Sequence, residues 1–241
     1  MVLQMAPYRA VIWGYGTVGA IVNVSLIQDV YSTKVHPGPD DKGVWSVTLK
    51  SHAAGGPFMI QGVQDNHGLL HWILLKGVLF GDVWVCSGQS NMQFTVSMLK
   101  NPAQELELAS KYTDIRLMTV MEEVSPLPKY DLIKIQELWS IPSNATLAGT
   151  DWSYFSAVCW LYGRHLFDAL QVPIGLVSST WGGTPIEAWS SGDALNHCGL
   201  DGLKQVNPSQ NSVLWNAMIH PLLNMTIKGA IWYQGESNYH Y

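Results

Sequence analysis

Three short segments of the sequence combine glycine with small polar side chains, at residues 87–91, 179–184 and 234–238. Each segment directly follows an apolar run with the length of a strand. Ligands of open parallel sheets bind beyond the carboxyl ends of the strands, and glycine lets a backbone N–H approach a ligand closely. The three segments therefore predict one site, formed by three loops at one edge of a sheet.

Ser90 is the residue of these loops best suited to covalent chemistry. It stands where a predicted strand, residues 82–86, turns into a helix predicted to continue to Leu99. A serine at such a turn exposes its hydroxyl, and the N–H groups at the start of the helix favour a developing oxyanion. This position predicts acyl transfer with Ser90 as the nucleophile. The competing interpretation is that Ser90 only caps the helix.

The segments that would position these loops alternate between strands and helices from residue 81 onward. Further strands are predicted at 115–120, 173–178 and 230–233, and helices at 156–171 and near 213–223. This order predicts an α/β fold with a parallel sheet covered on both faces. The proline-spotted segment 121–150 is predicted to be irregular.

The clearest helix, residues 156–171, has Ser156 as its expected cap. Its predicted buried face consists of Val158, Leu161, Tyr162, His165, Leu166, Ala169 and Leu170.

Residues 8–80 lack a helical period and predict a small all-β sandwich. The runs that predict its strands are residues 10–13, 20–26, 44–49, 58–63 and 69–75.

Gly14, Gly16 and Gly19 match a GxGxxG pattern within this region. The pattern binds a dinucleotide only where its glycines open a helix. The residues that follow, 20–26, are alternating and β-branched, which predicts a strand. We therefore interpret the glycines as a hairpin turn and disfavour a nucleotide site.

Composition excludes two broad classes of function. The chain has 241 residues, of which 47% are hydrophobic and 13% charged, and its net charge is -5. No apolar run approaches the ~18 residues of a membrane span, and no basic run indicates a nucleic-acid partner. Eleven tryptophans are available either for the core or for stacking on sugar rings.

Cysteines and glycosylation sequons say less about function. Cys86, Cys159 and Cys198 form no CxxC pair, which argues against a zinc or redox motif. Three sequons support secretion weakly, and they begin at Asn23, Asn144 and Asn224.

Several long blocks of the sequence resemble the signature blocks of sialate O-acetylesterases, which belong to the SGNH hydrolase superfamily. The blocks are residues 81–92, 181–189, 212–221 and 232–238, and residues 1–4 and 10–14 resemble the start of the family's N-terminal β-domain. The resemblance implies a β-sandwich-like domain at residues 1–80. It further implies an SGNH-like α/β esterase domain at residues 81–241 that lacks its C-terminal part.

The resemblance implies Ser90 as the nucleophile on an acetyl carbonyl, without a metal or an organic cofactor. The backbone N–H groups of Ser90 and of Gly183, in preference to Gly182, would line the oxyanion hole. Its third donor would be the side chain of Gln234, with Asn238 in reserve. Removing one such donor typically costs roughly 3–4 kcal/mol in the transition state.

The resemblance also implies a set of residues around the substrate, namely Gln89, Asn91, Gly182, Glu236 and Asn238. Glu236 either braces its loop or binds a sugar hydroxyl.

A serine nucleophile needs a neutral imidazole as its base, usually oriented by a carboxylate. The resemblance places both near the C-terminus, but the sequence contains no Asp-x-x-His. His165 is predicted to be structural, and His67 and His71 to be cross-strand or surface residues. His220 does not occupy the position of the base, and His240 lies at the end of the chain. We therefore expect a fragment, a short isoform or an incomplete gene model with very low hydrolytic activity.

The resemblance favours O-acetylated sialic acid as the substrate. Acetylated xylan is the neighbouring alternative, and a carbohydrate-binding remnant without catalysis is the alternative from another class. The resemblance also implies a lysosomal or secreted protein. The first residues show no leader, which leaves a cytosolic form open.

Overall fold

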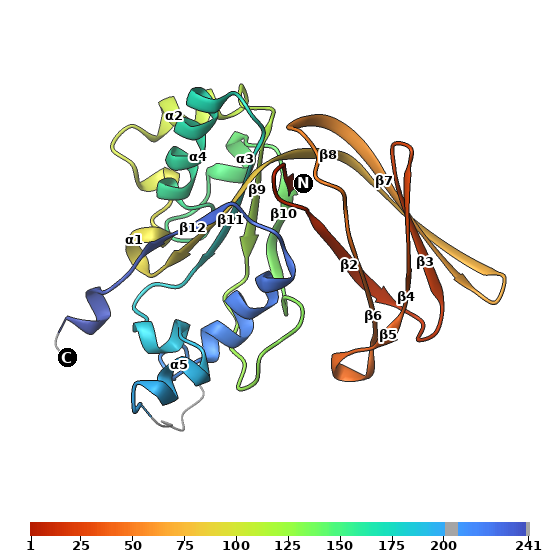
Figure 1. Cartoon of the computed structure of the whole chain (residues 1–241). Coiled ribbons are helices and arrows are strands. Elements are labelled where there is room, and N and C mark those ends of the chain that lie inside the picture. The colour runs from red at the N-terminus through yellow and green to blue at the C-terminus, as the bar shows by residue number, and fades with distance from the viewer. Residues whose placement is uncertain (201–206, 240–241) are drawn as a thin grey trace.

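A single strand of 20 residues, β8 (Leu69–Gly88), joins a β-rich part of the protein to an α/β part (Figure 1). The computed structural model describes residues 1–200 and 207–239. The sequence predicted two separate strands, at 69–75 and 82–86, and a domain boundary between residues 80 and 81. This prediction of separate strands is wrong, because residues 78–80 are apolar, fully buried and hydrogen-bonded into the same sheet.

In the α/β part, β8 lies in the middle of a parallel group of strands. It pairs on one side with β11 (Ile174–Thr180) and on the other with β12 (Gly229–Tyr233). Beyond β11 follow β9 (Ile115–Val120), also parallel, and β10 (Ile135–Ser140), which is antiparallel. The predicted parallel sheet is confirmed for four strands, which are β8, β9, β11 and β12. The strand β10 lies within the segment predicted to be irregular.

Helices cover both faces of this sheet (Figure 1). One face carries α1 (Ser90–Gln93), α2 (Pro102–Ala109), α3 (Asn144–Leu147) and α4 (Ala157–Leu170). The other carries α5 (Gly192–His197), the π-helical turn η4 (Trp215–Ile219) and the turn η5 (His220–Asn224). Neighbouring residues of a strand pack on opposite faces of the sheet. Leu176 packs beneath α4, whereas Val177 packs against Trp189 and Met218. Apolar side chains on both faces are typical of a covered parallel sheet.

The helix α4 begins as the sequence predicts, because the Ser156 hydroxyl accepts a hydrogen bond from the Cys159 N–H at 3.1 Å. Its buried face differs from the prediction. Gly163 lies against the sheet so closely that a Cβ there would overlap the Leu176 side chain. The helix therefore turns Cys159, Trp160 and Gly163 inward. Three residues of the predicted face are exposed instead, namely His165, Ala169 and Leu170.

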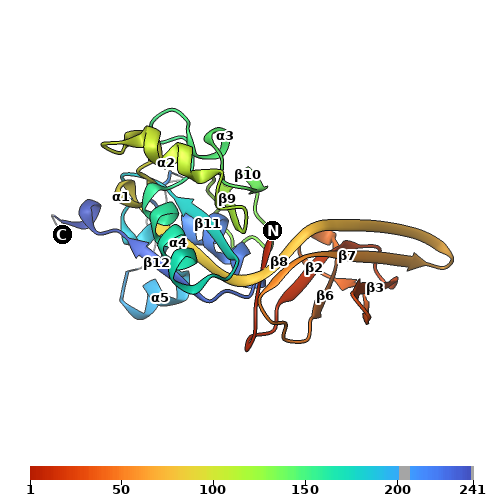
Figure 2. The ribbon, with the colours of Figure 1, turned by 90° about the horizontal axis from the view of Figure 1, so that it is seen from above.

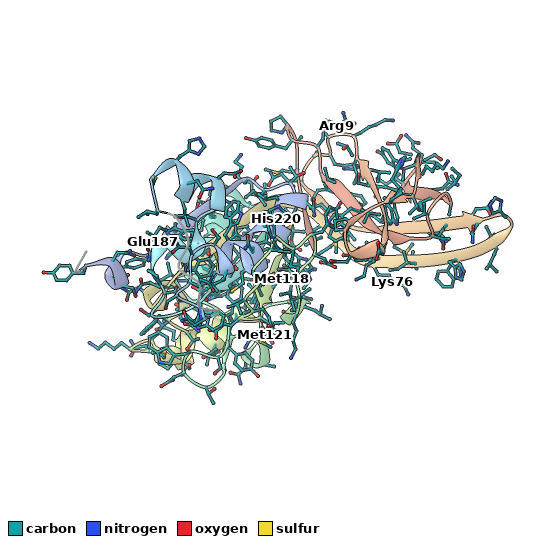
Figure 3. The ribbon with its side chains drawn as sticks, turned by 90° about the horizontal axis from the view of Figure 1, so that it is seen from below. Arg9, Lys76, Met118, Met121, Glu187 and His220 are labelled. Carbon is teal, nitrogen blue, oxygen red and sulfur yellow. A yellow bond between two sulfur atoms is a disulfide. The ribbon has the colours of Figure 1, made fainter. Side chains whose placement is uncertain are left out.

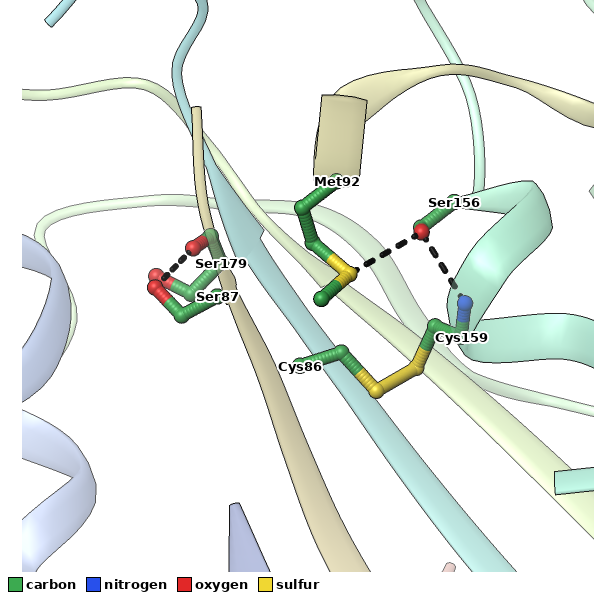
Figure 4. Close-up of a disulfide and its surroundings, with 6 residues drawn as sticks. All are labelled: Cys86, Ser87, Met92, Ser156, Cys159 and Ser179. Carbon is green, nitrogen blue, oxygen red and sulfur yellow. Dashed lines mark hydrogen bonds between the residues drawn. A yellow bond between two sulfur atoms is a disulfide. The ribbon is translucent and has the colours of Figure 1, made fainter. Parts of the chain in front are cut away.

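A buried disulfide joins Cys86 of β8 to Cys159 of α4 (Figure 4). Both cysteines are 0% exposed, and 73 residues separate them in the sequence. The sequence alone gave no reason to pair them, because only the fold brings the strand and the helix together. The disulfide lies four residues before Ser90 and thus ties the strand that carries it to the covering helix.

Replacing both cysteines by alanine is expected to lower the free energy of unfolding by about 4 kcal/mol, because the open loop gains entropy in the unfolded chain. Urea unfolding of the Cys86→Ala/Cys159→Ala variant measures this change. The matched control is Cys198→Ala, which removes an exposed, unpaired cysteine. Equal stabilities of the two variants would contradict the expected role.

The β-rich part is built from two facing sheets. One contains β3 (Ile21–Leu26), β4 (Asp29–Lys34), β7 (Gly55–Asn66) and the first half of β8, with β1 (Val2–Gln4) beside the middle of β8. The other contains β2 (Val11–Gly16), β5 (His36–Pro37) and β6 (Gly43–Thr48). Val22, Val47 and Phe80 are buried between them. Because β8 continues, the first sheet and the parallel strands form one mixed nine-stranded sheet in the described residues. From above, the β7–β8 hairpin extends away from the α/β part (Figure 2).

The structure corrects the interpretation of the GxGxxG pattern as a hairpin turn. A strand does follow the glycines, as predicted, but β2 pairs with β6 whereas β3 pairs with β4 and β7. Gly14 and Gly16 therefore lie within β2, and Gly19 lies where the chain passes from one sheet to the other. Among the described residues, no helix is both long and apolar enough to cross a membrane.

Candidate active site

Three strands end level with one another at one edge of the parallel sheet. Gly88, the last residue of β8, lies opposite Thr180 of β11 and Tyr233 of β12. The three glycine-containing loops that follow these strands are thus neighbours, with the loop of Ser90 in the middle. The predicted meeting of the three loops is confirmed.

Gly88 lies between the other two loops, and its backbone is in close contact with both. Its φ is +137°, and a Cβ at this position would overlap the carbonyl oxygen of Tyr233. The N–H of Gln89 donates to the Tyr233 carbonyl at 3.0 Å, and the N–H of Trp181 donates to the Gly88 carbonyl at 3.1 Å. Only glycine allows the backbones of all three loops to approach this closely.

Ser90 is the first residue of α1 and is partly exposed. The helix contains only four residues and ends at Gln93, since Phe94 and Thr95 leave helical geometry. The predicted helix to Leu99 is therefore too long. The N–H of Ser90 has no intramolecular acceptor in the described residues. The serine thus combines an accessible hydroxyl with an open backbone donor, although a helix this short adds little dipole.

Gly182 and Gly183 differ in what their N–H groups do. The N–H of Gly182 donates to Gln93 Oε1 at 2.7 Å, and a Cβ on Gly182 would lie 3.4 Å from the Cβ of Ser90. Gly183 is exposed with φ at +73°, and its N–H has no acceptor within the part of the chain that the structure describes. Gly183 is therefore the open donor of the pair.

Gln89 lies beneath the site, with only 2% of its surface exposed. Its Oε1 accepts from Gln234 Nε2 and from the N–H of Ser237, both at 3.2 Å, and its Nε2 lies 3.5 Å from Ser90 Oγ. The structure thus places Gln89 between Ser90 and the third loop rather than at the surface, where substrate would bind.

Gln234 and Asn238 link the loops to one another. Gln234 Nε2 lies 3.1–3.2 Å from three acceptors, which are Gln89 Oε1, the Thr184 carbonyl and Asn238 Oδ1. Asn238 accepts from the N–H of Ile186 and donates to Glu187, both at 2.9 Å. Both side-chain amides are therefore engaged. At the exposed rim, Asn91 donates a hydrogen bond to Glu236, which connects α1 to the third loop.

A further side-chain network adjoins the site and was not predicted. Gln93 Nε2 donates to Glu122 Oε1 at 2.6 Å and to the carbonyl of Trp152 at 3.2 Å. Partial burial raises the pKa of the Glu122 carboxyl, while the hydrogen bond from Gln93 acts in the opposite direction. One signal was available, because Glu122 stands two residues beyond the predicted strand 115–120, at the same sheet edge.

The histidines whose positions are described make no hydrogen bond with Ser90. His52 stacks on Phe80 at 4.5 Å in the β-rich part. His197 Nδ1 contacts the Asp193 carbonyl at 2.6 Å, and His220 Nδ1 contacts the Lys129 carbonyl at 2.7 Å. In Figure 3, His220 lies nearer the β-rich part than Glu187 does, and Glu187 lies toward the C-terminal turn η6 (Glu236–Asn238).

His36 lies in β5 of the β-rich part. His67 and His71 are exposed on the β7–β8 hairpin, as predicted. His165 is exposed on α4, which contradicts its predicted place in the core. His240 lies outside the described residues. Within residues 1–200 and 207–239, no cluster of three or more histidine, cysteine or acidic side chains is arranged to hold a metal.

The fold and site define an α/β protein with a serine at the carboxyl edge of a parallel sheet, beside loops with open backbone N–H groups. Residues 80–241 match the family described as carbohydrate esterase, sialic acid-specific acetylesterase, and the chain belongs to that family. The predicted resemblance is thereby confirmed.

Curated and structural relatives agree with this assignment. The chain is 47% identical to the sialate O-acetylesterase of Homo sapiens and 42% identical to that of Mus musculus, over all of its length in both cases. It spans about half of these relatives, 48% and 51% respectively. The crystal structure of a carbohydrate acetylesterase from Xanthomonas citri superposes with a TM-score of 0.83 at 32% identity, over 98% of this chain and 49% of that chain.

Proposed function

We propose that Ser90 is the nucleophile of an acetylesterase that acts on O-acetylated sugars. Its Oγ would bond to the acetyl carbonyl carbon while a base takes the hydroxyl proton, and the sugar alkoxide would leave and take that proton from the base. Water would then attack the acetyl-serine with the same proton transfers, which releases acetate and restores the serine hydroxyl. The observation that supports this best is the pair of open N–H groups, of Ser90 and Gly183, beside an accessible hydroxyl. Such donors stabilise the tetrahedral oxyanion without reorganising during the reaction.

The remaining predicted residues divide into positioning and contact roles in this proposal. Gln89 would hold the loop of Ser90 against the third loop through its buried amide. Gln234 remains the predicted third oxyanion donor, and this role requires its Nε2 to leave one of its three acceptors. Asn91, Gly182, Glu236 and Asn238 remain predicted substrate contacts.

The 241-residue chain is expected to hydrolyse acetyl esters only slowly. Within the described residues, no histidine hydrogen-bonds to Ser90. Serine hydrolases without a functional base retain roughly 10³–10⁴-fold catalysis over water, from the oxyanion hole and binding. We therefore expect added imidazole to act as the base and to raise the turnover of an acetyl ester.

The assay compares acetate release with and without imidazole, and subtracts the rate of the Ser90→Ala variant in the same buffer. A gain that depends on Ser90 supports the proposal. No gain, with acetylated sugar still bound, would favour the alternative of a carbohydrate-binding remnant. The lack of a histidine bonded to Ser90 among the described residues supports that alternative. Unassisted turnover that equals a complete esterase would contradict the expectation of a missing base.

For the substrate, we propose O-acetylated sialic acid, because the family is named for sialic acid-specific acetylesterases. Acetylated xylan remains the alternative sugar. The imidazole-assisted assay discriminates the two, and a clear preference for acetylated xylan would overturn the choice of sialic acid.

We also propose a lysosomal or secreted location. A fully buried disulfide forms in an oxidising compartment and is rare in the cytosol. Asn144, one of the three sequon asparagines, is exposed and could carry a glycan there.

A further inference from the structure

Trp152 has an unusual backbone conformation for so large a side chain, and its ring is exposed. Its φ is +66°, a left-handed conformation that bulky residues rarely adopt. Its side chain is 44% exposed, and one edge packs against Phe94 with ring centroids 6.1 Å apart and planes at 87°. Backbone outliers of this kind often occur at ligand sites, where the surroundings hold them in place.

The segment around Trp152 is fixed on several sides. The ring of Tyr154 packs so closely on Gly149 that a Cβ there would overlap it. Ser153 donates its N–H to the Thr150 carbonyl at 3.1 Å, and its own carbonyl accepts a hydrogen bond from Gln136. The exposed indole is therefore held by its loop before any ligand binds.

One side chain connects Trp152 to the loops beside Ser90. Gln93 Nε2 donates to the Trp152 carbonyl at 3.2 Å, and Gln93 Oε1 accepts from the N–H of Gly182 at 2.7 Å. Gln93 also donates to Glu122 at 2.6 Å, which leaves the other Glu122 carboxylate oxygen without a donor among the described residues. The backbone of Trp152 and the unused acceptor of Glu122 are thus both linked, through the Gln93 side chain, to the loop that contains the predicted oxyanion donor.

We propose that Trp152 forms a stacking subsite for the sugar ring that carries the acetyl ester. The apolar C–H face of a sugar ring packs on an indole, and the second oxygen of Glu122 would accept from a sugar hydroxyl at the edge of that ring. This subsite deepens the proposed function and rests on it, because the stacked sugar would present its acetyl group to Ser90.

The test measures the binding of an O-acetylated methyl glycoside of N-acetylneuraminic acid, and of acetylated xylotriose, by saturation-transfer NMR and titration calorimetry. All variants carry Ser90→Ala, so that no ester is cleaved. Trp152→Ala is expected to raise the Kd of the preferred sugar about tenfold and to remove saturation transfer to its ring protons. Trp152→Phe, which keeps an aromatic face, should restore most of the affinity.

The matched control is Trp72→Ala on the β7–β8 hairpin, where the side chain is 70% exposed and outside the site. This variant should bind sugar as tightly as its Ser90→Ala parent. Equal affinities for Trp152→Ala and the parent, or no binding of either sugar by the parent, would overturn the subsite. A failure of the proposed function appears separately, as acetyl-ester turnover that does not depend on Ser90.

Discussion

The Ser90→Ala variant is expected to gain no more rate from imidazole than buffer alone gains, and to keep only the residual catalysis of the oxyanion hole and binding. The change removes the only oxygen that the account uses as a nucleophile, while the backbone N–H groups stay in place. Ser90 is partly exposed, and within the described residues its hydroxyl makes only the long 3.5 Å contact with Gln89. The variant should therefore unfold at the same urea concentration as the parent.

Ser110→Ala is the matched control for this change, because Ser110 is an exposed serine at the end of α2. It should retain the full imidazole-assisted rate. Turnover by Ser90→Ala at the rate of this control would show that another group carries the chemistry.

Gly88→Ala is expected to destabilise the protein by more than about 4 kcal/mol, a size that points to a defined structural defect. The added Cβ would overlap the Tyr233 carbonyl, which already accepts from the N–H of Gln89 at 3.0 Å. Relief of this overlap requires β8 and β12 to separate, and the Ser90 and Gln234 loops would part with them. Urea unfolding and near-UV circular dichroism measure the loss.

Gly68→Ala is the matched control, because Gly68 also has a positive φ, at +90°, but a Cβ there would meet nothing within 4 Å. It isolates the cost of a left-handed backbone, about 1–2 kcal/mol. Equal destabilisation by the two changes would show that the contact with Tyr233 is not what requires glycine at position 88.

Local patterns in the sequence were enough to predict the parallel strands and the meeting of the three loops. Residues 115–120 form β9 as predicted, and Ser156 caps α4 through the Cys159 N–H. These features depend on contacts between near neighbours or on runs of apolar residues, which a sequence shows directly. Glycine-rich ends of parallel strands meet at one sheet edge in any fold of this class.

Features that depend on distant contacts could not be predicted in the same way. The strand β8 is continuous because residues 78–80 are buried in the core. The residues that bury them come from distant parts of the chain, so the sequence does not show this contact. The Cys86–Cys159 disulfide joins residues that are 73 positions apart. The buried face of α4 was displaced because Gly163, and not a larger apolar residue, makes its closest contact with the sheet.

In the site, too, some features could be predicted from local sequence patterns and others only from contacts between distant residues. Ser90 and Gly183 have the accessible positions that the motifs indicate, whereas the engagement of Gln234 with three acceptors appears only in three dimensions. Trp152 follows no strand and belongs to no recognised block, so its exposure beside the Gln93 network had no signal in the sequence.

The most direct measurement is a crystal structure of the chain with methylboronic acid, which mimics the tetrahedral state of an acetyl group. We expect a bond from boron to Ser90 Oγ, and one boronate oxygen within hydrogen-bond distance of the N–H groups of both Ser90 and Gly183. A boronate absent from Ser90, or bound there with that oxygen turned away from both donors, would contradict the account.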